Sequence, residues 1–227
     1  MAKPWRVVDN IETDEGLLEL RQRGERDYLI TIDQRVLMNS SANKSEIVLS
    51  ELACESLRDK KNVRVLVGGL GMGFTLKAAL DNLPVDAEVL VAELNPIMVQ
   101  WCQGPMAHLT DGAVDDERVT VVIGNVAEVI RQAAMKDKKD SFDAIILDLY
   151  EGPYEGDQGR GEYLYGDAAL ELSRSALKPG GVLAVWSEDP DKAFENRLQA
   201  ARFSVNLQRP GRGGRRHVVY IARKTAN

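Results

Sequence analysis

The sequence predicts an α/β fold built on a doubly wound, Rossmann-like sheet, and three observations lead to this prediction. A short β-branched apolar run, residues 63–67, ends abruptly in a cluster of glycines. A segment with helical spacing, residues 74–83, follows these glycines directly. Apolar runs and helical segments then alternate along the chain, and such alternation requires crossover connections within an α/β sheet.

The composition excludes several classes of function. The chain has 227 residues, 44% of them hydrophobic, which is enough for one domain with a small appendage. A formal net charge of −6 argues against nucleic-acid and membrane binding. Cys54 and Cys102 form no C-x-x-C pair, and the first residues lack the apolar core of a signal peptide, so we expect a reduced, cytoplasmic protein. Two histidines, His108 and His217, give little support for a metal site.

Residues 1–44 are predicted to form a small N-terminal β region, with strands at 16–20, 28–32 and 36–38. Residues 45–227 are predicted to form the main domain. Its first helix is expected to be capped by Ser45 and to bury Ile47, Val48, Leu52 and Leu57.

The main domain then alternates strands and helices. Strands are expected near 63–68, 87–92, 118–123, 143–148 and 180–186. Helices are expected near 74–83, 95–103, 125–136, 165–177 and 190–201, and Lys178-Pro179-Gly180-Gly181 is a helix stop. The chain is expected to end in an antiparallel hairpin, 202–207 with 217–222. Its basic loop, 209–216, is interpreted as a solvated turn in preference to an anion or RNA contact.

The glycine cluster indicates a nucleoside site. Gly68, Gly69, Gly71 and Gly73 permit a tight turn whose backbone can approach a ligand at a helix N-terminus. The dinucleotide pattern G-x-G-x-x-G fails at Phe74, which disfavours a nicotinamide oxidoreductase. The observed G-x-G-x-G spacing resembles motif I of the transferases that use S-adenosylmethionine (AdoMet); a purely steric turn is the alternative.

Residues at the ends of the next strands extend this site. Glu93 lies 22 residues after Gly71, where an acid can accept hydrogen bonds from ribose hydroxyls, and Leu94 follows it. A solvated charge at a strand end is the alternative for Glu93. Asn125, followed by Val126, could pair with an adenine edge, cap the next helix, or do both.

Asp148 and Glu151 are the candidate catalytic residues. Asp148 ends the apolar run 142–147, and a carboxylate there could orient an acceptor amine and take its proton. The alternative is that Asp148 only braces the turn. The glycine-rich, acidic segment that follows, Gly152–Tyr163, is interpreted as a mobile lid.

Five successive motifs resemble those of the spermidine synthase (polyamine aminopropyltransferase) family. They are V-L-V-G-G-L-G-M-G, A-E-L-N-P, D-E-R-V-T-V-V-I-G-N, F-D-A-I-I-L-D-L-Y-E-G-P and L-K-P-G-G-V-L, and the likeness runs from about Gly16 to the final hairpin. The resemblance implies an AdoMet-transferase type of Rossmann fold and a decarboxylated AdoMet donor whose aminopropyl group passes to a diamine. It also implies that Glu93 binds ribose, that Asn125 replaces an adenine-site aspartate, and that Asp148 is the catalytic acid.

Three departures bear on the acceptor. The family's G-G-G-D-G-G loop has an acid where this chain has Met72, and its diamine-site tyrosine aligns with Leu49. Its D-S-S-D motif becomes Asp148-Leu149-Tyr150-Glu151.

The function expected from the sequence is transfer of an aminopropyl or methyl group from decarboxylated AdoMet or AdoMet to a small acceptor, possibly an amine. Because the leaving group is a neutral thioether, no metal is expected. We also expect a homodimer. The alternative is a non-catalytic nucleoside-binding homologue that has lost the polyamine site.

Overall fold

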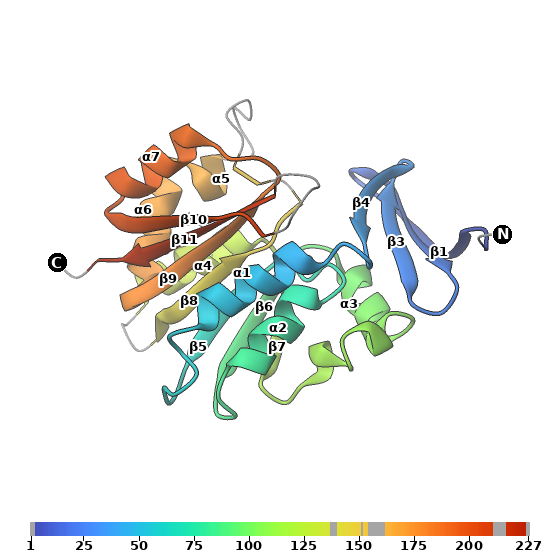
Figure 1. The fold of residues 1–227 in the computed structure, drawn as a ribbon, viewed down its shortest axis with the longest axis horizontal. Coiled ribbons are helices and arrows are strands. Elements are labelled where there is room, and N and C mark those ends of the chain that lie inside the picture. Colours follow the sequence, from blue (N-terminus) through green and yellow to red (C-terminus); the bar gives the residue numbers. More distant parts are fainter. Residues whose placement is uncertain (1–2, 137–139, 151, 154–161, 211–216, 226–227) are drawn as a thin grey trace.

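The computed structural model describes residues 3–136, 140–150, 152–153, 162–210 and 217–225. Two separate sheets organise these residues (Figure 1). The four-stranded antiparallel sheet has the order β1-β2-β3-β4, and the seven-stranded mixed sheet has the order β10-β11-β9-β8-β5-β6-β7. An α/β fold with a small N-terminal β region is therefore confirmed.

The N-terminal sheet contains one strand more than the sequence indicated. Its strands are β1 (Arg6–Thr13), β2 (Gly16–Arg23), β3 (Asp27–Ile32) and β4 (Arg35–Asn39). The sequence does not reveal β1 because most of its side chains are exposed, so it lacks an alternating apolar pattern. Pairing with β2, from Arg6↔Gln22 to Thr13↔Gly16, holds β1 at the sheet edge.

The large sheet is wound in two directions from β5. Its strands are β5 (Arg64–Gly68), β6 (Glu88–Glu93), β7 (Val119–Ile123), β8 (Phe142–Leu147), β9 (Leu177–Ser187), β10 (Phe203–Gln208) and β11 (Val218–Lys224). From β5 the chain adds β6 and β7 on one side, then returns to add β8 and β9 on the other. β5 and β8 are parallel neighbours, so the sheet's switch point lies at their carboxyl ends. The antiparallel hairpin β10–β11 is confirmed at the end of the chain.

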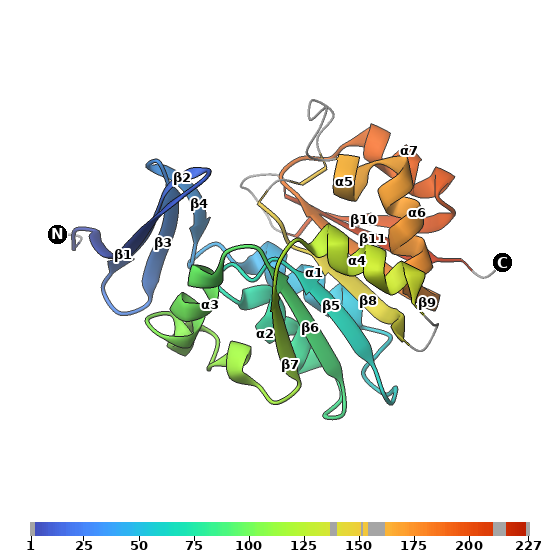
Figure 2. The same ribbon diagram turned by 180° about the vertical axis from the view of Figure 1, so that it is seen from behind.

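Helices cover both faces of this sheet (Figures 1 and 2). They are α1 (Lys44–Cys54), α2 (Phe74–Asn82), α3 (Pro96–Gln103), α4 (Val126–Met135), α5 (Glu162–Tyr165), α6 (Asp167–Ala176) and α7 (Lys192–Ala200), with short 3₁₀ turns at Ala107–Leu109 and Ala113–Asp115. Side chains of α1, α2 and α3 pack into one buried cluster, and those of α4, α6 and α7 into a second.

Two details of the predicted helices are wrong. The first helix begins at Lys44 after Asn43, with no side-chain cap, and it buries Leu49 and Ala53 while Ile47, Val48 and Leu52 remain half-buried. The buried side chains Leu49, Ala53 and Leu57 are spaced i, i+4 and i+8. This face is buried because α1 packs against β8, β9 and β11.

The region expected to hold one helix over 165–177 contains α5 and α6, separated at Gly166. The helix stop is confirmed, since α6 ends at Ala176. Residues 178–181 already belong to β9, however, because Phe142 of β8 pairs with Leu177.

Side chains fasten the N-terminal sheet to the main body. The Tyr28 hydroxyl donates to the Pro105 carbonyl at 2.8 Å, and Trp101 Nε1 donates to Asp9 Oδ2 at 2.8 Å. Met38 of β4 lies against Gly71 of the glycine loop. The small sheet is thereby fixed beside α3 and one end of the large sheet (Figure 1).

None of the described helices is both long and apolar enough to cross a membrane.

Candidate functional site

The glycine loop joins β5 to α2 at the carboxyl edge of the large sheet. Gly69 and Gly71 have positive φ angles of 85° and 52°, in the region that favours glycine. A Cβ at Gly69 would lie 2.5 Å from the backbone oxygen of Asp148. A Cβ at Gly68 would lie 2.8 Å from Val126 Cγ2. The loop is thus packed closely against the end of β8 and the start of α4.

Glu93 is the last residue of β6, and its carboxylate binds the backbone of this loop. Its side chain is buried, and Oε2 accepts a hydrogen bond from the Leu70 N–H at 2.8 Å. Oε1 accepts one from the Asn95 N–H at 2.8 Å. The structure therefore brings the predicted ribose acid to the glycine loop, and each oxygen keeps a second lone pair for a ligand hydroxyl. The ribose contact stays a prediction.

The other predicted nucleoside residues surround the same edge. Leu94 is 67% exposed directly after Glu93. Asn125 Oδ1 accepts from the Ala127 N–H at 2.9 Å, so its role as the cap of α4 is confirmed while its adenine contact stays a prediction. Val126 is buried against Gly68, which places its side chain in the core and makes it a support of the loop.

Asp148 follows β8 at the switch point. Its backbone N–H donates to the Gly68 carbonyl at 3.0 Å, and its Oδ2 accepts a hydrogen bond from the Thr75 hydroxyl in the first turn of α2. Burial first, and then the charge of Glu46, raise the pKa of Asp148 to about 7, while the Thr75 hydrogen bond opposes the shift. A carboxyl group in this state can accept a proton near neutral pH.

The second predicted catalytic residue, Glu151, lies outside the described residues, and so does most of the predicted lid, Gly152–Tyr163. Gly73 closes the loop at the start of α2, with φ 82°.

Sequence reasoning missed a group of side chains that are linked to one another and to Asp148 on the α1 face of the sheet. Glu46 lies in the first turn of α1, and Trp186 lies beside Asp148 because Leu147 pairs with Val185 in the β8–β9 register. His217 immediately precedes β11, and its ring meets the Trp186 ring edge-on with centroids 5.0 Å apart. Together with Ser45 and Thr75 they form what we call the α1-face cluster, whose members are Ser45, Glu46, Thr75, Asp148, Trp186 and His217. The acidic start of α1 was the one available signal.

Two positions that depart from the resembled family are apolar and closed. Met72 is 1% exposed in the glycine loop, and Leu49 is fully buried in α1. Neither offers a polar group to a ligand.

A family model described as "Spermine/spermidine synthase domain" matches residues 45–205, most of the chain. The chain belongs to the spermine/spermidine synthase family. The transferase fold and the family resemblance inferred from the motifs are confirmed.

Curated members of the family are distant and longer. A polyamine aminopropyltransferase of Thermotoga petrophila is 31% identical over 127 residues, which cover 56% of this chain and 39% of that protein. Polyamine aminopropyltransferase 1 of Hyperthermus butylicus is 34% identical over 53% of this chain and 39% of its own length. The chain thus spans less than half the length of these relatives.

Solved structures share the fold. A spermidine synthase from Thermotoga maritima superposes with a TM-score of 0.72 at 20% identity, covering 98% of this chain and 74% of that one. Human methyltransferase-like protein 13 in complex with SAH gives a TM-score of 0.60 at 20% identity over 82% of each chain. These likenesses establish the AdoMet-transferase type of fold.

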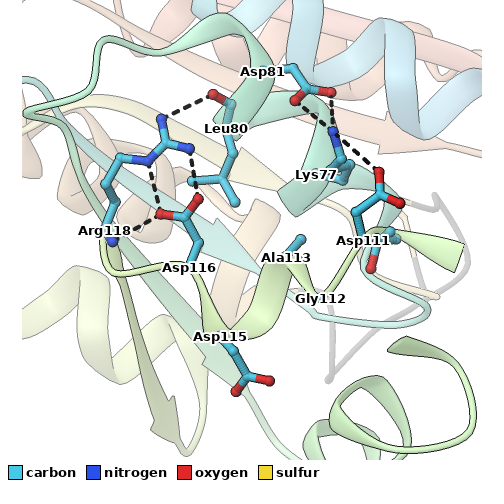
Figure 3. A pocket seen from close by; sticks show the side chains of 10 residues that line it. Lys77, Leu80, Asp81, Asp111, Gly112, Ala113, Asp115, Asp116 and Arg118 are labelled. Carbon is cyan, nitrogen blue, oxygen red and sulfur yellow. Dashed lines mark hydrogen bonds and ion pairs between the residues drawn. The ribbon is translucent and has the colours of Figure 1, made fainter. Parts of the chain in front are cut away.

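A hollow of about 370 Å³ opens elsewhere, between α2 and the turn at Ala113–Asp115 (Figure 3). Its charges pair with one another: Arg118 binds Asp116 at 2.8 Å, and Lys77 binds Asp81 at 2.6 Å. Arg118 holds the pKa of Asp116 at about 2. We interpret this hollow as a structural ion-pair cluster. Within the described ranges, no group of three His, Cys, Asp or Glu side chains could hold a metal ion.

Proposed function

We propose that this family member is a group transferase that binds decarboxylated AdoMet or AdoMet and transfers an aminopropyl or methyl group to a small amine. The observation that carries the proposal is Asp148, a carboxyl group with a pKa of about 7, held beside the glycine loop at the switch point of the sheet. The nucleoside would lie along the glycine loop, with Glu93 at its ribose and Leu94 and Asn125 near its adenine.

The proposed step is a substitution at a carbon bound to the sulfonium. The lone pair of the amine attacks this carbon, the new C–N bond forms, and the C–S bond breaks with its electrons going to sulfur. The proton that the bound ammonium group loses to free this lone pair passes to Asp148, the thioether leaves without charge, and the product leaves as a substituted ammonium ion. Catalysis would come mainly from alignment of the two reactants and from this proton transfer.

An amine acceptor is supported by the charge at the site. Asp148 and Glu46 lie close enough that the Glu46 charge raises the Asp148 pKa. Two carboxyl groups at one site repel each other, and an ammonium group placed between them would relieve this repulsion. The site would therefore bind a cationic amine and then remove its proton.

Calorimetry with four ligands tests the donor site. We expect 5′-methylthioadenosine, AdoMet and decarboxylated AdoMet to bind, and NAD to bind more weakly than any of them. Incubation of each sulfonium donor with amines, thiols and small carboxylates, followed by mass spectrometry, then identifies the group transferred. NAD binding more tightly than methylthioadenosine would contradict the proposal.

The second candidate is a nucleoside-binding protein without turnover. It is favoured by the apolar, closed Met72 and Leu49, which stand where the resembled family has an acid and a tyrosine. This candidate predicts methylthioadenosine binding but no product with any donor and acceptor pair.

A further inference from the structure

A chain of hydrogen bonds crosses from the last strand pair to α1. His217 Nδ1 lies 3.2 Å from Ser45 Oγ, and Ser45 Oγ lies 2.6 Å from Glu46 Oε2. Ser45 is buried, while His217 and Glu46 are half-buried. The three residues come from opposite ends of the domain, so the tertiary fold alone joins them.

The number of available protons determines which group donates in each of these hydrogen bonds. A serine hydroxyl has one proton, and an ionised carboxylate can only accept. Ser45 therefore donates to Glu46, and its oxygen must accept from His217, which requires a proton on Nδ1. The arrangement holds in the neutral imidazole with a proton on Nδ1 as well as in the imidazolium, so it persists over the whole range in which histidine titrates.

The far end of the chain is Glu46, whose charge acts on Asp148. His217 is itself held by Trp186, the residue beside Asp148, through the edge-on contact of their rings. The imidazole is thus held on one side by packing against Trp186. On its other side it holds Ser45, and through Ser45 also Glu46, by hydrogen bonds.

We infer that His217 is a positioning residue for the acceptor: through Ser45 it orients the Glu46 carboxylate toward the ammonium group of the substrate. The inference rests on the proposed function, because it concerns the amine side of that reaction. A carboxylate held by a hydrogen-bonded hydroxyl loses less side-chain freedom when it binds a cation, so the preorganised pair binds the amine more tightly. His217 does not touch the reacting atoms.

Two substitutions separate the hydrogen bond from the packing. His217→Asn keeps an N–H near the Nδ1 position but loses the ring, and His217→Phe keeps a ring against Trp186 but loses the donor. The probe is 1,4-diaminobutane, titrated into protein saturated with 5′-methylthioadenosine. We expect about a 3- to 10-fold loss of diamine affinity for His217→Phe, the effect of one hydrogen bond, and less for His217→Asn. Affinity for 5′-methylthioadenosine alone should be unchanged in both variants.

The tautomer of His217 tests these hydrogen bonds in the protein without ligand and without substitution of His217. Nitrogen NMR of histidine-labelled protein shows which ring nitrogen is protonated, and the second histidine, His108, is identified by His108→Asn. We expect neutral His217 in the Nδ1–H form, and Ser45→Ala should shift it toward Nε2–H.

The outcomes are distinguishable. If His217→Phe bound the diamine with wild-type affinity and His217→Asn bound it more weakly, the ring would serve only to pack. A predominantly Nε2–H tautomer of His217 would contradict the proposed hydrogen bonds. Either result would overturn the role of His217 and leave the proposed function standing. Absence of diamine binding in the wild type, with methylthioadenosine bound, would overturn the amine acceptor and the role of His217 with it. Failure of methylthioadenosine to bind would contradict the donor site.

Discussion

At the scale of single residues, the proposed proton acceptor Asp148 shows how a raised pKa opposes stability. Its carboxyl group accepts a hydrogen bond from Thr75, yet burial and the charge of Glu46 disfavour its ionised form. The same raised pKa that suits a base near neutral pH makes the ionised group costly to hold in the fold.

Replacing Asp148 by Asn tests the catalytic role. Asn keeps the shape of the side chain but cannot take a proton, so turnover should fall by about 10²- to 10⁴-fold while nucleoside affinity changes little. In the unmodified protein, kcat/KM should rise with pH and level off above about 7, because the ionised carboxylate is the active form. Exposed Asp189→Asn is the control. Turnover of Asp148→Asn at the parent rate would refute the mechanism.

The same substitution makes a prediction about stability. The folded pKa of Asp148, about 7, lies above its usual value of 3.8, so its neutral form stabilises the fold and this stability is lost as pH rises from about 4 to 7. Asp148→Asn removes that dependence. In urea unfolding at pH 8 the variant should be about 1–3 kcal/mol more stable than the parent, with a smaller difference at pH 4. Equal curves at pH 8 would show that burial does not disfavour the charge.

Glu93 is expected to serve both the loop and the ligand. Both of its oxygens accept backbone N–H groups, so Glu93→Gln must turn an amide N–H toward one of them. Calorimetry with methylthioadenosine should show binding weakened by about 1–3 kcal/mol, and unfolding without ligand should show lower stability. Glu88→Gln on the same strand, where the side chain is 78% exposed, should change neither. Unchanged affinity in Glu93→Gln would remove this residue from the ribose.

At the scale of elements, the β5–α2 loop has glycines that are required for different reasons. At Gly69 a Cβ would meet the Asp148 backbone, which cannot move without displacing β8. At Gly71 it would meet the end of the flexible Met38 side chain. Gly112 lies outside this loop, between the two 3₁₀ turns, and serves as a comparison: nothing lies within 4 Å of a Cβ placed there, so only the positive φ of 70° opposes a larger residue.

These differences predict the order of three alanine substitutions. Gly112→Ala should cost about 1 kcal/mol, from backbone conformation alone. Gly71→Ala should cost slightly more, and Gly69→Ala should cost most and abolish methylthioadenosine binding. Denaturant unfolding and calorimetry on the three variants measure this order. A Gly69→Ala protein as stable as Gly112→Ala would contradict the close packing of Gly69 against the Asp148 backbone.

At the scale of the whole molecule, hydrogen bonds at Trp101, Pro105 and His108, in and after α3, join the small sheet to the main body. Trp101→Phe removes the bond to Asp9 and keeps most of the buried ring, so the free energy of unfolding should fall by about 1–2 kcal/mol. Tyr28→Phe should act in the same direction through Pro105. Trp5→Phe, whose ring stacks with Arg23 within the small sheet, is the control. An unchanged urea midpoint in Trp101→Phe would mean that this bond does not couple the sheets.

The division at residues 44 and 45, the homodimer and the cytoplasmic location all stay predictions. Sedimentation of the intact chain would decide the oligomeric state.

The sequence by itself determined the alternation of strands and helices, the glycine loop and the carboxylates at the strand ends. Those features are local: apolar periodicity, glycine spacing and residues that stop helices are properties of a few neighbouring residues. For the same reason Glu93, Asn125 and Asp148 were found as candidates, since each follows a buried run.

Only the tertiary structure decided which residues lie together on the α1 face beside Asp148. Ser45 and His217 are 172 positions apart in the chain, and they meet because α1 lies across β9 and β11. Edge strand β1 was missed because its pairing with β2, and not an apolar pattern, holds it. The state of Asp148 likewise depends on Glu46 and on burial, because a charge interacts with whatever lies near it in space, however distant in sequence.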